Sequence, residues 1–221
     1  MDQTARAHQI FKLAKSLYAA GPTKYRLGFR TLKSAAAIGS LNAHEWLGAA
    51  YDYGMGVNKN RHRAFQHYLV AAERGNPNAE YHVGIFYLEG RGTRRSDRLA
   101  VVWLRRAVRH GDPTAMHVLG QCYRYGRGIS KNPRAGLALE LKAAHKGVLE
   151  AQFSVGVCLS KGEGVTVNPR KAFRWYMKAA RRGHADAAHN VAHMYQIGRG
   201  VPHSSTRAKR WYTRERALRS N

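Results

Sequence analysis

The sequence predicts an all-α protein, a right-handed α/α solenoid of about five to six helix-turn-helix repeats, each 36 residues long. Three observations support this prediction. Five segments align without a gap at that period. Each segment carries two glycines separated by one residue, as expected for a turn that ends a helix. Each also has a helix-capping residue six places after the first of these glycines. Because one such repeat cannot bury its apolar face alone, we expect the repeats to stack.

The aligned segments set the expected domain organisation. They begin at Ala43, Ala79, Ala115, Ala151 and Ala187, which predicts one solenoid domain over 1–221 with full repeats at 43–78, 79–114, 115–150 and 151–186. The segment 7–42 lacks the paired glycines but keeps Ala35, Ala36 and Gly39 in register, so we interpret it as a degenerate N-terminal repeat. We expect 187–221 to be a C-terminal capping repeat, because Glu215 and Arg216 replace the paired alanines and give it a polar end.

The first helix of each repeat is expected to cover about eleven residues. Between Ala79 and Glu89, for example, apolar side chains recur at helical spacing. The paired glycines that follow, such as Gly90 and Gly92, favour the left-handed backbone that ends a helix. The residues expected to cap these first helices are Asn42, Asn78, Thr114 and Asp186.

The second helix of each repeat has clearer boundaries. Its expected N-caps are Asn60, Ser96, Asn132, Asn168 and Ser204. Pro133 and Pro169 follow two of these caps, at the first helical position, where a missing N–H costs nothing. The glycines expected to end these helices are Gly75, Gly111, Gly147 and Gly183.

Composition narrows the functional classes. With 44% apolar residues the chain is expected to fold, and it has no run of 18 apolar residues. The stretch from Met1 to Ala20 mixes charges into its apolar positions, so we expect neither a spanning helix nor a secretory signal. Cys122 and Cys158 cannot form a disulfide framework, and their places in adjacent repeats predict two buried thiols. We expect a cytoplasmic protein, with export by a non-classical route as the alternative.

The motifs of the repeat resemble the Sel1-like repeat family. The fourth repeat carries nearly the whole pattern, namely Val155, Gly156, Gly162, Gly164, Val165, Lys171, Ala172, Phe173, Trp175, Tyr176, Lys178, Ala179, Ala180 and Gly183. The resemblance covers 43–221 well and 7–42 weakly, and it implies an adaptor that organises protein complexes, without a reaction, a cofactor or a small-molecule substrate. The third repeat departs from the pattern at Gly136, Leu139 and Glu140, where we expect a local bend or a partner contact.

Similarity to tetratricopeptide repeats implies that the first helices line a concave groove for a protein or peptide partner. The residues expected to face this groove are Glu45, Asp52, Tyr81, Ile85, Leu88, His117, Gln121, Arg124, Phe153, Val157, His189 and His193. The wider surface of the same helices also includes Tyr53, Glu89, Tyr125, Lys161 and Ile197.

Most of the basic residues lie outside the first helices. The chain has 38 Lys and Arg against 13 acids, a net charge of +25, which attracts nucleic acid, acidic proteins or anionic membrane surfaces. The five first-helix windows hold six acids and only two bases, so the second helices and turns form a basic back. Its representatives are Arg105, Arg106, Arg109, Arg174, Lys178, Arg181 and Arg182. Two interpretations stay open: a surface for an anionic partner, or a solvated face that keeps the protein soluble.

Three patterns imitate chemical sites. The Gly-x-Gly turns lack the strand and the Lys-Ser/Thr of a phosphate loop, so we interpret them as helix ends. His189 and His193 have zinc-like i, i+4 spacing with His184 and His203 nearby, but no cysteine completes the set, and we expect no metal. No nucleophile-base or paired-carboxylate arrangement stands out, so we expect no enzyme and no catalytic residue.

Overall fold

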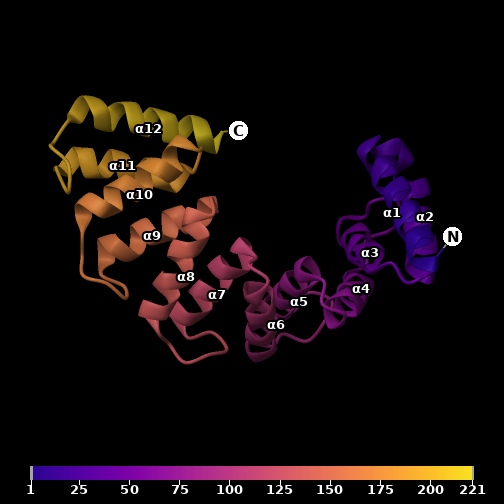
Figure 1. Cartoon of the computed structure of the whole chain (residues 1–221). Coiled ribbons are helices and arrows are strands. Elements are labelled where there is room, and N and C mark those ends of the chain that lie inside the picture. Colours follow the sequence, from indigo (N-terminus) through magenta and orange to yellow (C-terminus); the bar gives the residue numbers. More distant parts are fainter. Residues whose placement is uncertain (1, 221) are drawn as a thin grey trace. The chain divides into compact units, whose positions relative to one another are not determined.

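The computed structural model describes residues 2–220, and within them the chain is all helical (Figure 1). These residues form twelve α-helices and one short 3-10 helix, Pro22–Lys24, with no strand. Consecutive helices pair into hairpins, which confirms the predicted all-α solenoid of helix-turn-helix repeats.

The helices alternate between the two places of the repeat. The odd-numbered helices are α1 (Gln3–Ala19), α3 (Leu41–Tyr53), α5 (Pro77–Glu89), α7 (Pro113–Tyr125), α9 (Leu149–Lys161) and α11 (Ala185–Ile197). The even-numbered helices are α2 (Tyr25–Ala37), α4 (Arg61–Glu73), α6 (Asp97–Arg109), α8 (Pro133–His145), α10 (Pro169–Arg181) and α12 (Ser205–Arg219). The chain divides into two compact units, the N-terminal unit up to Asp112 and the C-terminal unit from Pro113.

The odd-numbered helices begin two residues earlier than predicted. Asn42 and Asn78 do not cap α3 and α5; Ser40 Oγ accepts the Ala43 N–H at 3.3 Å and Asn76 Oδ1 accepts the Ala79 N–H at 3.0 Å. Thr114 and Asp186 likewise lie inside α7 and α11. The reason is the tightness of the preceding turn, in which only three residues, the middle one a left-handed glycine, separate the two helices. Proline at the first position of α5 and α7 was the sequence signal for this earlier start.

The even-numbered helices from α4 to α12 begin where the sequence predicts. The side chains of Asn60, Ser96, Asn132, Asn168 and Ser204 each accept the N–H of the residue three places later. These caps were predictable because they depend only on a bond within one turn of the chain. The glycines after the even-numbered helices also adopt the predicted left-handed conformation, with φ of +84° at Gly75 and Gly111.

Inside a repeat, a glycine of the odd-numbered helix lies against a large side chain of the even-numbered helix. A Cβ on Gly156 would lie 2.6 Å from the Tyr176 ring, and one on Gly48 would lie 2.8 Å from the Tyr68 ring. Tyr68 is fully buried, and Phe65 and Phe86 pack around it. The absence of a side chain on the glycine therefore lets the aromatic ring fill the interior of the hairpin.

Between repeats of one unit, the second glycine of the Gly-x-Gly turn makes a backbone contact, as at Gly56, Gly92, Gly164 and Gly200. Gly92 has φ +66°, and a Cβ there would lie 2.2 Å from the Arg61 carbonyl oxygen at the start of α4. Gly164 meets Pro133 at the start of α8 in the same way, at 2.5 Å. The turn is thus both a helix end, as predicted, and a contact that sets the spacing of neighbouring repeats.

In the irregular third repeat, a close contact between α7 and α8 and a buried polar pair replace the packing seen in the other repeats. Gly136 brings α8 so close to α7 that a Cβ there would lie 2.6 Å from the Gly120 carbonyl oxygen. Glu140 occupies the interior place that Tyr176 fills in the next repeat, and it is 0% exposed. Its carboxylate is 2.6 Å from His117 Nδ1, so a polar pair replaces the apolar packing of the other repeats.

Candidate protein-binding surface

Each odd-numbered helix from α3 to α11 presents one stripe of residues spaced i, i+4 and i+8. In the N-terminal unit the stripe consists of Glu45, Ala49, Tyr53, Tyr81, Ile85 and Glu89. In the C-terminal unit it consists of Gln121, Tyr125, Phe153, Val157, Lys161, His189, His193 and Ile197. We call these residues the odd-helix stripe. Its members at the C-terminal ends of the helices, Tyr53, Glu89, Tyr125, Lys161 and Ile197, are all exposed.

The prediction that twelve residues face the groove is wrong for four of them, because their side chains are buried. Asp52, Leu88, His117 and Arg124 are each at most 8% exposed. Asp52, Leu88 and Arg124 share one place in the repeat, one residue before the exposed Tyr53, Glu89 and Tyr125. A shift of one residue turns a side chain by about 100° around a helix, which carries it from the surface to the interior.

The burial of Asp52 and Arg124 has a structural cause. Arg91, in the turn after α5, donates from Nη2 to both oxygens of Asp52, at 2.6 and 2.8 Å. In the C-terminal unit the charges are exchanged, and Arg124 Nε lies 3.4 Å from Glu163 Oε2 in the turn after α9. These pairs join a turn to the odd-numbered helix of the preceding repeat, so they hold repeats together and are not available to a partner.

The remaining partners of Arg124 are also internal. Its Nη1 donates to Cys158 Sγ at 3.2 Å, and its Nη2 donates to the Tyr125 hydroxyl, while the guanidinium lies over the Tyr125 ring. Burial raises the pKa of the Cys158 thiol, although Arg124 opposes that shift. Cys122 and Cys158 are both buried free thiols, as predicted. Cys158 is therefore a packing residue rather than a reactive nucleophile.

His117 is buried by its pair with Glu140. The side-chain amide of Gln121 donates to His117 Nε2 at 3.2 Å, so both ring nitrogens of the histidine have partners. Glu140 Oε1 is buried without a hydrogen-bond partner among the described residues. The pair thus leaves Gln121 as the stripe residue of α7 that faces outward, together with Tyr125.

The other predicted groove residues lie on the stripe. Glu45, Tyr81, Ile85, Gln121, Phe153 and Val157 are half-buried, whereas His189 and His193 are exposed. Phe153 stacks on His184 with ring centroids 4.4 Å apart, and burial raises the pKa values of Glu45 and Tyr81. The large exposed apolar residues of these helices, Tyr53, Tyr125 and Ile197, were assigned by the sequence only to the wider surface.

The predicted basic back consists of six exposed cations and one half-buried arginine. Arg105, Arg109, Arg174, Lys178, Arg181 and Arg182 are exposed. Arg106 is different, because it donates to Glu80 Oε1 at 2.9 Å and to the Ala72 carbonyl at 3.2 Å, with its guanidinium over the Trp103 ring. Arg106 is half-buried and is the counter-charge of Glu80, which is 1% exposed, so it is less available to a partner than the exposed cations.

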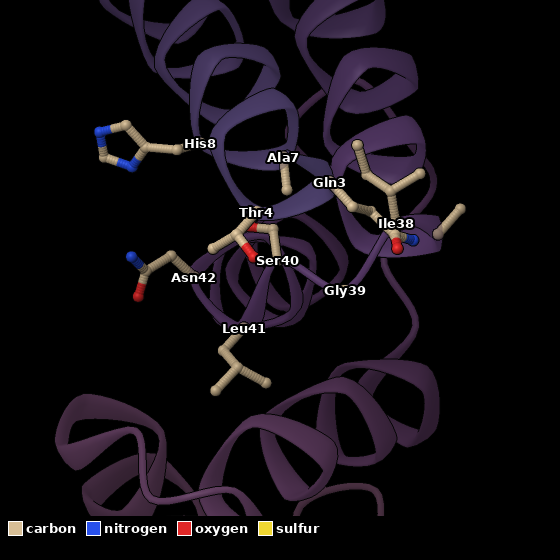
Figure 2. A pocket seen from close by; sticks show the side chains of 10 residues that line it. Gln3, Thr4, Ala7, His8, Ile38, Gly39, Ser40, Leu41 and Asn42 are labelled. Atoms are coloured by element: carbon tan, nitrogen blue, oxygen red, sulfur yellow. The ribbon is translucent and has the colours of Figure 1, made fainter. Parts of the chain in front are cut away.

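A hollow of about 660 Å³ lies between the start of α1 and the turn that joins α2 to α3. Figure 2 shows His8 and Asn42 on one side of this hollow, with Gln3 and Ile38 on the other. Its lining carries no Lys, Arg, Asp or Glu. Elsewhere in 2–220, no three His, Cys, Asp or Glu residues gather as metal ligands would, and no helix has the length and apolarity to cross a bilayer.

The family model described as the Sel1 repeat matches five consecutive segments, 41–76, 77–112, 113–148, 149–184 and 185–214. The chain belongs to the Sel1 repeat family. Each matched Sel1 repeat starts at the first residue of an odd-numbered helix, two residues before the repeat boundaries taken from the sequence. Sel1 repeat proteins are generally non-enzymatic scaffolds for protein interaction.

Solved structures agree with this assignment. A Sel1 repeat protein from Oxalobacter formigenes is 30% identical, with 94% of this chain and 82% of that chain covered and a TM-score of 0.87. The protein c5321, a protective antigen of uropathogenic Escherichia coli with an SLR fold, is 26% identical with a TM-score of 0.88. That match covers 97% of this chain but 46% of c5321, so this chain spans less than half the length of that protein.

A third structure shares the fold alone. The immunity protein PA5088 from Pseudomonas aeruginosa is 20% identical, with a TM-score of 0.61 over 97% of this chain and 82% of that chain. The sequence matches none of the curated proteins with which it was compared.

Proposed function

We propose that this Sel1 repeat protein is a non-catalytic cytoplasmic adaptor that binds a protein or peptide partner through the odd-helix stripe of each unit. One observation carries the proposal. The same place at the end of α3, α7 and α11 holds Tyr53, Tyr125 and Ile197, which are 61%, 57% and 52% exposed. Large apolar side chains repeated at one exposed place are typical of an interaction surface.

The composition of the stripe favours a protein partner over a nucleic acid. Its charged members are Glu45, Glu89 and Lys161, so the stripe is close to neutral although the chain as a whole is strongly basic. A phosphate backbone requires clustered Lys and Arg, which this surface lacks. Tyrosine, isoleucine, phenylalanine and histidine together suit a mixed apolar and hydrogen-bonding contact.

The test compares two exposed apolar surfaces of the same protein. The full chain serves as bait for native lysate, and proteins retained by the wild type are quantified for each variant by mass spectrometry. We expect Tyr125→Ala/Ile197→Ala to lose a defined subset of partners that Leu99→Ala/Val102→Ala on α6 retains, because Leu99 and Val102 are 45% and 53% exposed but lie off the stripe. Equal retention by both variants would remove the stripe as the binding surface.

A second candidate function is the binding of an anionic partner, such as nucleic acid or an anionic membrane surface, by the even-numbered helices. The observation that favours it is the sequence of α10, which has four Arg, two Lys and no acid between Pro169 and Arg182. The neutral interpretation, a face kept for solubility, predicts no specific ligand.

A further inference from the structure

The even-numbered helices of the C-terminal unit form a basic surface with little neutralising charge. α8 and α10 are neighbours, since His145 meets the Trp175 ring edge-on at 5.3 Å. α10 and α12 are neighbours as well, since Arg214 Nη2 donates to the Arg181 carbonyl at 3.2 Å. Each of α8 and α12 has one acid, Glu140 and Glu215, and α10 has none.

Neither acid neutralises the exposed cations of α10. Glu140 is fully buried against His117, as described above. Glu215 Oε1 accepts from Arg219 Nε at 2.7 Å, and its other oxygen lies 3.6 Å from His189 Nδ1. The cations Arg174, Lys178 and Arg181 are exposed and lie at i, i+4 and i+7, on one side of α10. Such a row selects an anionic ligand.

The same side of α10 has an apolar hollow. A space of about 430 Å³ is lined by Phe173, Arg174, Met177, Lys178, Arg181 and Arg182. Phe173 and Met177 are half-buried and one helical turn apart, so they supply apolar surface between the cations. A methionine beside an aromatic ring adapts to apolar side chains of different shapes. The ligand that fits therefore has one apolar group for the hollow and anionic groups on either side of it for the cations.

The aromatic rings here do not offer a stacking platform for bases. Lys178 Nζ lies 5.2 Å from the centre of the Trp175 ring, and His145 meets the same ring edge-on. Phe173 packs edge-to-face against Tyr195 with centroids 5.2 Å apart. Single-stranded nucleic acid binds by stacking bases on open aromatic faces, and these rings are already engaged by neighbouring side chains. These contacts favour a peptide over a single-stranded nucleic acid.

We propose that the α10 surface binds an acidic peptide segment of a partner protein, which places one large apolar side chain in the hollow over Phe173 and Met177. Carboxylates on either side of that residue pair with Arg174, Lys178 and Arg181. Arg182 has a different role, because it donates to the Gly147 carbonyl at 2.7 Å and to Gln152 Oε1 at 3.1 Å and so anchors the end of α10. This surface shares no residue with the odd-helix stripe, so the two binding modes are independent.

The test measures fluorescence anisotropy of a labelled peptide, Glu-Asp-Glu-Leu-Asp-Glu-Glu, with the full chain at low and moderate salt. We expect saturable binding that weakens about tenfold in Arg174→Glu/Arg181→Glu, because two attractive contacts become repulsive. Replacing the central leucine of the peptide by alanine is expected to weaken binding about fivefold, because the hollow loses its apolar occupant.

The matched control is Arg98→Glu/Arg109→Glu, the same charge change at two exposed arginines of α6. It lowers the net charge equally, and we expect it to retain peptide binding within about twofold, because these arginines belong to the N-terminal unit and take no part in the α10 surface. Arg174→Lys/Arg181→Lys is expected to restore binding, and the thermal midpoint of each variant checks that it folds. Tyr125→Ala/Ile197→Ala is expected to leave peptide binding intact, which distinguishes failure here from failure of the odd-helix stripe.

Three results would overturn the proposal. Equal affinity for the leucine and alanine peptides would mean that only net charge is sensed. Equal loss in the α6 control would mean that no local surface is involved. Tighter binding of a single-stranded RNA of equal charge, or of vesicles containing anionic lipid, with displacement of the peptide, would assign the α10 surface to phosphate instead.

Discussion

At the scale of single residues, the third repeat shows how a polar pair substitutes for apolar packing. Glu140 is fully buried where the neighbouring repeats have Leu104 and Tyr176. A buried carboxylate is unfavourable unless a partner compensates it, and His117 supplies that partner at 2.6 Å. The sequence showed the departure from the pattern, but its compensation depends on a residue 23 places away in another helix.

Removing one member of this pair is expected to destabilise the C-terminal unit. Glu140→Ala leaves a cavity and removes the hydrogen-bond partner of His117 Nδ1, and we expect it to lower the unfolding free energy by about 2 to 4 kcal/mol. The double variant His117→Phe/Glu140→Tyr imitates Phe153 and Tyr176 of the next repeat, and we expect it to recover most of that loss. Urea denaturation followed by circular dichroism measures both effects. An unchanged midpoint in Glu140→Ala would contradict the importance of the pair.

Two histidines of the N-terminal unit make stability depend on pH. Burial, with smaller contributions from His44 and nearby cations, lowers the pKa of His67 to about 4, and burial also lowers the pKa of His44. Since an unfolded histidine titrates near pH 6.5, the unfolded state binds more protons between about pH 6.5 and pH 4. The contribution of these histidines to the unfolding free energy is therefore fully present above pH 6.5, and it is lost as the pH drops toward 4.

Replacing His67 isolates this contribution. His67→Leu introduces the residue found at the equivalent place of α8, Leu139, and we expect a shallower loss of stability between pH 6.5 and 4. Thermal midpoints measured across this range for the wild type and the variant give the difference. Parallel curves would show that the burial of His67 does not govern the acid sensitivity. Titrating groups that do not contact His67 contribute equally to both proteins, so the difference reports His67 together with its neighbour His44, whose Nδ1 is 3.1 Å from that of His67.

At the scale of elements, the two glycines of a Gly-x-Gly turn have different roles: the first ends a helix and the second contacts the neighbouring repeat. Gly92→Ala places a Cβ 2.2 Å from the Arg61 carbonyl oxygen in addition to the left-handed strain, and we expect a loss of about 3 kcal/mol or more. Gly75→Ala is the control, because φ is +84° but nothing lies within 4 Å of its Cβ. That variant is expected to lose about 1 to 2 kcal/mol, from backbone strain alone. Equal losses in urea denaturation would argue against the inter-repeat contact.

Helix boundaries were only partly predictable. The caps of the even-numbered helices were correct because each is a side-chain bond to an N–H three residues ahead. The odd-numbered helices were placed two residues late because Asn42 and Asn78 are plausible caps by residue type alone. Choosing between Asn76 and Asn78 requires knowledge of where the preceding turn ends, which is a property of two helices rather than one.

At the scale of the whole molecule, net charge is the dominant electrostatic feature. A chain with +25 charges repels itself in the folded state, and dissolved ions screen that repulsion. We expect the thermal midpoint to rise when salt increases from about 0.05 to about 0.5 M, as the screening length falls well below 10 Å. The charge-reduced variant Arg98→Glu/Arg174→Glu should show a smaller rise. A midpoint independent of salt would mean that ion pairs such as Asp52–Arg91 offset the repulsion.

The sequence by itself determined the period, the helical hairpin, the capping of the even-numbered helices and the concentration of basic residues outside the odd-numbered helices. These features follow from residue type and spacing within a single repeat. The tertiary structure decided which residues of the odd-numbered helices are surface and which are interior. Asp52 and Arg124 became interior because turns 39 residues further along the chain cover them, and His117 because Glu140 does. Helical periodicity locates a face to within one residue, whereas burial is fixed by the neighbouring repeat that packs against it.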